Sequence, residues 1–121
     1  MKTQFLVLAL FATACGASYP VPTQRMADAQ SAHRSAQELG ADKQPAAQLH
    51  LKLAEEQIAK ANVILKDEDY RRADFMLIRA KADAELALAL AHEQKSVADA
   101  RQATEQFNAQ ATTNDTTQGA R

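Results

Sequence analysis

The feature that most constrains the fold is a stretch from Tyr70 to Phe107 that contains neither glycine nor proline. The residues that end helices most effectively are thus missing over what would be about 57 Å of helix, at about 1.5 Å per residue. Alanine recurs at heptad-like spacing in the first half of this stretch, at positions 73, 80, 84, 87 and 91. A seam of such small residues lets another helix backbone approach closely. The sequence therefore predicts one long helix that packs against others through its first half.

Two shorter helices are predicted before it. The first begins near Thr23, carries small or apolar residues at helical spacing, and ends at Gly40. The second begins at Pro45, which suits a first helical turn, and would run about 33 Å. Its apolar residues alternate in steps of three and four and are Leu51, Ala54, Ile58, Ala61 and Leu65. In the acidic turn that follows, Asp67 or Asp69 can cap the long helix.

These elements predict an all-α fold. Short linkers force neighbouring helices to run antiparallel, and 5% aromatic residues with no tryptophan leave few large side chains for a bulky interior. We expect an antiparallel helical hairpin or three-helix bundle with one long C-terminal helix and an extended N-terminal tether. The predicted division of the chain is a lipoprotein signal peptide over residues 1–14, a lipidated tether over 15–22, an alanine-rich helical domain over 23–108, and a polar, disordered tail over 109–121.

The first residues have the pattern of an export signal. Lys2 supplies positive charge, residues 5–12 supply a short apolar core, and small residues lead to Cys15. The apolar run is shorter than the about 20 residues that a membrane-spanning helix needs. The segment from Ala12 to Cys15 resembles the lipobox of bacterial lipoproteins, which implies signal cleavage after Ala14 and attachment of acyl chains such as palmitate to Cys15. The alternative is a secreted protein with a free thiol.

The lipobox resemblance also implies a location. Gly16 follows the cysteine, in place of the aspartate that retains many such lipoproteins at the inner membrane. The expected place is therefore the bacterial cell envelope, with the chain anchored to the outer membrane by lipid and facing the periplasm. Each buried acyl methylene contributes about 0.8 kcal/mol, so several chains together hold a protein durably.

The helical region resembles a known family. The resemblance lies in an alanine-rich helix that ends in LGA before a proline, and in the segments KLAEEQIAKA and DEDYRRADFMLIRAKADAELALALA. Over about residues 18–91 the chain is similar to the DUF4398 family (domain of unknown function 4398) of bacterial envelope lipoproteins. This resemblance implies an all-helical periplasmic domain with no assigned reaction. Residues 69–82 also resemble one tetratricopeptide-repeat helix, although a repeat array needs about three copies.

Candidate catalytic and metal-binding residues form no known motif. His33, His50 and His92 lack the spacing of a metal-binding helix pair. Carboxylates occur without an accompanying nucleophile, oxyanion donor or glycine-rich loop. A formal net charge of −1, or −2 once Lys2 leaves with the leader, provides no basic stripe for nucleic acid. The sequence therefore predicts no enzyme, no catalytic residue, no cofactor, no metal and no nucleic-acid partner.

Three arginines of the long helix have two interpretations. Arg71, Arg72 and Arg79 could bind phosphate groups or cell-wall carboxylates. Asp74 and Asp83 lie nearby at helical spacing, so ordinary surface ion pairs are the simpler interpretation.

The second half of the long helix is the remaining feature of interest. Because the second helix is much shorter, residues 92–107 would have no partner within the chain. Val97, Ala100, Thr104 and Phe107 follow one another in steps of three, four and three, so they share one face. Two interpretations stay open. The segment frays, because a lone helix of that length is marginal in water, or this face pairs with a second copy or another envelope protein.

The sequence thus predicts a non-enzymatic, lipid-anchored envelope protein that acts as a helical interaction or scaffold module in the periplasm. Its expected partners are the membrane, through the lipid anchor, and an envelope protein or second copy, through coiled-coil-like pairing of the long helix. The alternative is a cell-wall-associated spacer or stabiliser resembling murein lipoprotein. That family attaches to peptidoglycan through a terminal lysine, whereas this sequence ends in arginine, so covalent attachment is not expected.

Overall fold

The computed structural model describes residues 18–118, with side chains described as far as Thr113. This part of the chain contains three α helices and one short 3₁₀ turn, and no strand. The elements are α1 (Thr23–Glu38), η1 (Ala41–Lys43), α2 (Pro45–Lys66) and α3 (Tyr70–Gln118). The predicted all-α fold is confirmed.

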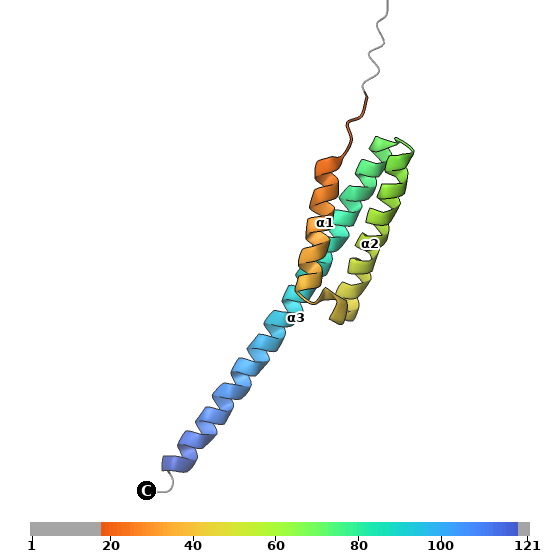
Figure 1. The fold of residues 1–121 in the computed structure, drawn as a ribbon. Coiled ribbons are helices and arrows are strands. Elements are labelled where there is room, and N and C mark those ends of the chain that lie inside the picture. The colour runs from red at the N-terminus through yellow and green to blue at the C-terminus, as the bar shows by residue number, and fades with distance from the viewer. Residues whose placement is uncertain (1–17, 119–121) are drawn as a thin grey trace, which may run out of the picture.

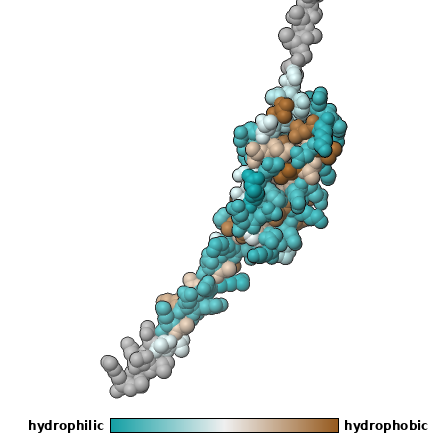
Figure 2. Space-filling model, viewed as in Figure 1, coloured by the Kyte–Doolittle hydropathy of each residue, from teal (hydrophilic) through white to brown (hydrophobic). Residues whose placement is uncertain are grey.

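The helices form a bundle from which one helix projects. α2 runs antiparallel to both of its neighbours, so α1 and the first half of α3 point in the same direction (Figure 1). α3 has 49 residues against 22 in α2, which corresponds to about 74 Å against about 33 Å. Its second half therefore extends past the bundle, at the end opposite the N-terminal segment, and is covered mainly by hydrophilic residues (Figures 1 and 2). The predicted three-helix bundle with one long C-terminal helix is confirmed.

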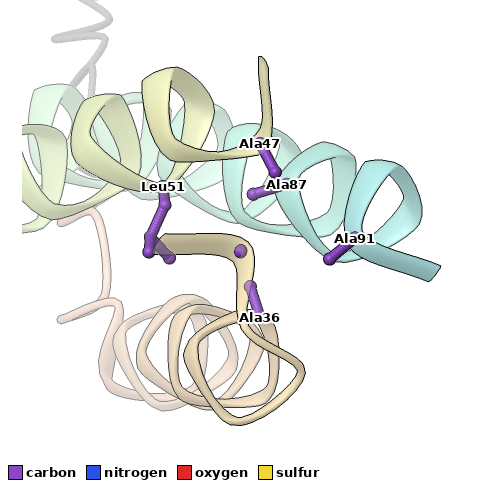
Figure 3. Packing of buried hydrophobic residues seen from close by; sticks show 6 residues of the cluster. Ala36, Ala47, Leu51, Ala87 and Ala91 are labelled. Atoms are coloured by element: carbon purple, nitrogen blue, oxygen red, sulfur yellow. The ribbon is translucent and has the colours of Figure 1, made fainter. Parts of the chain in front are cut away.

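The bundle core consists mainly of alanine. Every alanine of the predicted α3 seam is buried, and three of them, Ala80, Ala87 and Ala91, cluster with buried alanines of α1 and α2. At the η1 end of the bundle, one hydrophobic cluster contains residues from α1, η1, α2 and α3 (Figure 3). Its buried members are Ala36, Ala41, Ala47, Leu51, Ala87 and Ala91. Leu77 is the largest fully buried side chain of the described residues. Small side chains at the contacts let the helices pack closely, as predicted.

The buried face of α2 differs from the prediction in part. Leu51, Ala54 and Ala61 are buried as predicted. Ile58 is only half-buried, and the polar neighbour Gln57 is buried instead, with 7% of its surface exposed. Further along, Ile64 is buried and the predicted Leu65 is half-buried, so the buried face of the second half of α2 lies one residue earlier than predicted. Gln57 donates a hydrogen bond to Asp83 of α3, which offsets part of the cost of burying its amide, while its side-chain oxygen has no hydrogen-bond partner.

The starts of all three helices and the end of α1 follow the predicted signals. Gly40 adopts a left-handed conformation with φ 85° directly after α1, and Pro45 is the first residue of α2. Asp69 caps α3, since its Oδ1 accepts a hydrogen bond from the backbone N–H of Arg72 at 3.1 Å. α1 begins at Thr23 as predicted, without a capping hydrogen bond from a side chain.

The end of α3 also differs from the prediction. We expected the helix to end near Phe107 and a disordered tail to occupy residues 109–121, but α3 continues to Gln118. No glycine or proline lies between Tyr70 and Gly119. The hydroxyl of Thr112 donates to the backbone carbonyl four residues earlier at 2.9 Å. A polar segment can extend an existing helix residue by residue, because the costly nucleation step has already been made.

Candidate functional site

The projecting half of α3 is the most exposed helical surface of the described residues. Every described side chain from His92 to Thr113 is exposed to solvent. Of the predicted partner face, Val97 is 41% exposed and Phe107 is 71% exposed, and Ala100 and Thr104 are also exposed. The structure therefore places these four residues on one uncovered helix. Their binding of a partner stays a prediction.

The local chemistry of this face suits helix packing. A shallow, open depression runs along it, lined by Val97, Ala100, Arg101, Thr104 and Glu105. The Thr104 hydroxyl already donates to the Ala100 carbonyl oxygen at 2.9 Å, which ties it to its own helix. The face thus offers methyl groups and an aromatic ring with charged residues at its edge, which is the pattern of a helix-to-helix contact.

A polar contact at the opposite end of the bundle fixes the N-terminal segment. Asp74 on α3 is 5% exposed. The hydroxyl of Tyr19 donates to Asp74 Oδ2 at 2.7 Å, and Arg25 Nε on α1 forms an ion pair with Asp74 Oδ1. The hydrogen bond to Asp74 raises the pKa of the Tyr19 phenol, because the protonated hydroxyl is the donor. The described part of the predicted tether, residues 18–22, is therefore not helical and is docked on the bundle through Tyr19.

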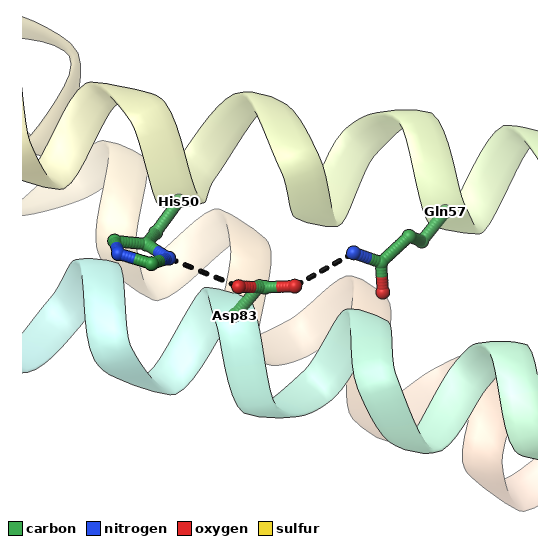
Figure 4. A network of polar contacts seen from close by, with 3 residues as sticks. All are labelled: His50, Gln57 and Asp83. Carbon is green, nitrogen blue, oxygen red and sulfur yellow. Dashed lines mark hydrogen bonds and ion pairs between the residues drawn. The ribbon is translucent and has the colours of Figure 1, made fainter.

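A second polar contact joins α2 to α3. Asp83 Oδ1 lies 2.9 Å from His50 Nδ1, and Asp83 Oδ2 accepts a hydrogen bond from Gln57 Nε2 at 2.6 Å (Figure 4). Both carboxylate oxygens are thus engaged by side chains of the neighbouring helix. This arrangement positions α2 against α3 rather than presenting Asp83 as a free base.

These contacts correct the predicted pairing of the α3 arginines. Asp74 and Asp83 point to α1 and α2 and do not pair with arginines of their own helix. Arg71 instead lies over the Phe75 ring, with 5.9 Å from its guanidinium carbon to the ring centroid. Among the described residues, the guanidinium of Arg79 makes no ion pair or hydrogen bond. The arginine surface of α3 is therefore less neutralised than the sequence suggested.

The other predicted residues fall in two groups. Ala14 and Cys15 lie outside the described residues, as does the whole predicted signal peptide. The histidines lie on three separate helices, and the described residues contain no group of three side chains suited to hold a metal ion. None of the described helices has an apolar stretch long enough to cross a membrane.

Comparison with known proteins gives a family. The family model described as a domain of unknown function (DUF4398) matches residues 24–103, which include α1, α2 and the first part of the projecting half of α3. The chain belongs to the DUF4398 family. No curated protein and no solved structure matches it. The DUF4398 match ends between Ala100 and Phe107, so it covers part of the candidate face.

Proposed function

We propose that this DUF4398 protein is a non-enzymatic, lipid-anchored protein of the bacterial cell envelope that acts as a helical interaction module. In this proposal, Cys15 carries acyl chains in the outer membrane, and the helical bundle faces the periplasm. The projecting half of α3, from His92 onward, is the part that binds a partner. We call it the free half, and we call residues 70–91 of the same helix the bundle half.

The observation that carries the proposal is the uncovered second half of α3. An isolated helix of this length gains little from its own backbone, because helices in water depend on packing for most of their stability. Apolar residues on one face, including the 71%-exposed Phe107, would gain burial from a partner. The free half also projects from the bundle end opposite the N-terminal segment, so an anchor preceding that segment would leave it accessible (Figure 1).

The elongated form supports a second candidate, a cell-wall-associated spacer or stabiliser. The N-terminal segment and the end of α3 lie at opposite ends of the described part (Figure 1). With α3 about 74 Å long, such a rod could hold two layers of the envelope apart. In that role its length would matter more than the residues of one face.

Replacing Cys15 with serine tests the anchor. We expect the wild-type chain to begin at a lipidated Cys15 and to partition with membranes, since acyl chains supply the membrane affinity. The Cys15→Ser variant should remain uncleaved or become soluble. Mass spectrometry of the mature amino terminus gives the measurement. A wild-type chain that starts at Ala17 or later without modification contradicts lipidation.

Shortening α3 tests the interaction role. A chain ending at His92 should lose the crosslinked partners that the full chain has in intact envelopes, because the candidate face is removed. A chain ending at Asn108 is the matched control, because it keeps Val97 through Phe107, and it should retain those partners. If the chain ending at His92 keeps the same crosslinked partners as the full chain, the interaction proposal is wrong. If both shortened chains lose these partners, the length of α3 determines whether the partners are bound, as the spacer role requires.

A further inference from the structure

The apolar face of the free half continues along the back of the bundle. An α helix turns about 100° per residue, so residues in heptad steps stay on one side. One set of exposed residues on α3 keeps these steps along most of its length, and we call it the back stripe: Phe75, Ala82, Leu86, Ala89, Ala100 and Phe107. The buried residues Leu77, Ala84 and Ala91 each follow a stripe residue by two positions, or about 200°. The back stripe therefore lies opposite the bundle core.

Side-chain size varies along the back stripe. Within the bundle, Phe75 is 55% exposed and Leu86 is 43% exposed, and alanines occupy positions 82 and 89. The free half has small residues at positions 96, 100 and 103. Large side chains pack well against small ones on a facing helix. The small residues at positions 96 and 100 of one chain therefore leave room for Phe75 of another.

Charge points to the same arrangement. Arg79 and Glu93 occupy the same heptad position as Leu86 and Ala100, so both interrupt the back stripe. In the described part of the chain, neither side chain has an ion-pair partner. Two copies packed in parallel would oppose Arg79 to Arg79 and Glu93 to Glu93, which is destabilising. Two antiparallel copies centred near Leu86 would bring each Arg79 beside the Glu93 of the other copy.

We infer that the back stripe is a self-association surface on which two copies of this chain pair through antiparallel α3 helices. With the pair centred near Leu86, residues 92–102 of each copy lie against residues 70–80 of the other, and Phe75 lies opposite Val97 of the second copy. The rest of α3, including Phe107, extends past this contact. The two contacts are equivalent by twofold symmetry. This inference rests on the proposed function and names its partner. Both lipid anchors can reach one membrane if the pair lies along the membrane surface.

Reversing the two stripe charges tests the inference. The full lipid-anchored chain, purified in detergent, should associate to a dimer in sedimentation equilibrium over a concentration series. Arg79→Glu or Glu93→Arg alone should lower the association constant about fivefold or more, because two symmetric ion pairs become two repulsions. The double variant should restore association to within about twofold of the wild type. Lys60→Glu and Glu56→Arg are matched controls on the exposed surface of α2 and should have no effect.

A second pair of variants tests the apolar part of the stripe. Ala100→Glu should weaken association, whereas Ala98→Glu, exposed on the opposite side of α3, should not. A full chain that stays monomeric at every concentration contradicts self-association. A dimer that none of the stripe variants weakens contradicts the back stripe as its surface, and so does a double variant whose association constant stays as low as that of the single variants. If a monomeric chain still loses envelope crosslinks when it ends at His92, the partner is another protein and the interaction role stands. If the full chain is a dimer but the chain ending at His92 keeps the same envelope crosslinks, the proposed interaction role is wrong.

Discussion

Replacing Leu77 with alanine is expected to lower the free energy of unfolding by about 2–5 kcal/mol. Leu77 is fully buried where the three helices meet, against Ala29 of α1, Ala61 of α2 and Ala80 of its own helix. Truncation removes the apolar area that it buries and leaves a cavity among side chains too small to fill it. Urea unfolding followed by far-ultraviolet circular dichroism measures the change.

The surroundings of Leu77 decide where in that range the value falls. Met26 and Met76 pack beside the cluster, and flexible methionines can move into part of a cavity, which favours the lower end. Leu49→Ala is the matched control, because Leu49 is 58% exposed and should change stability far less. Equal losses from the two variants would show that Leu77 is not the central packing residue of the bundle.

Much of the fold could be predicted because helix and seam signals are local. The glycine- and proline-free stretch after Tyr70 fixed the long helix, and Gly40 and Pro45 marked the first turn. Heptad spacing identified the α3 alanines that are buried. These predictions need only residue type and spacing, and both can be read directly from the sequence.

The polar contacts between elements could not be predicted in the same way. Tyr19 and Asp74 are 55 residues apart in sequence, and their hydrogen bond depends on how α1 and α3 align. Asp83 lies one position from the alanine seam, and spacing alone assigned it to the surface. Gln57 is buried beside Asp83, which accepts a hydrogen bond from its amide N–H. An apolar pattern treats such residues as exposed, so it misplaced the edge of the α2 face.

The candidate face was predicted in part. Periodicity placed Val97, Ala100, Thr104 and Phe107 together, and the difference in helix length left them without a partner. The extension of this face to Phe75 could not be seen before the bundle was known. Apolar residues between positions 75 and 90 face several directions, and only their burial shows which ones the bundle leaves uncovered.

Replacing Ala84 with leucine is expected to lower the free energy of unfolding by about 1–3 kcal/mol. Ala84 is fully buried in the α3 seam, directly after Asp83, whose carboxylate holds His50 and Gln57 of α2. Three added carbon atoms would push α2 and α3 apart, which strains these hydrogen bonds as well as the packing. The midpoint of thermal unfolding should fall accordingly.

A leucine on the exposed surface separates overpacking from the effect of leucine itself. Ala59 is exposed on α2, and alanine and leucine have similar helix propensities, so Ala59→Leu should change stability by no more than about 0.5 kcal/mol. Close approach of α3 to its neighbours requires a small residue at position 84 and tolerates a large one at position 59. If Ala84→Leu unfolds at the same temperature as the wild type, the closely packed alanine seam is wrong, and the helices must be held together by the larger residues at its edges.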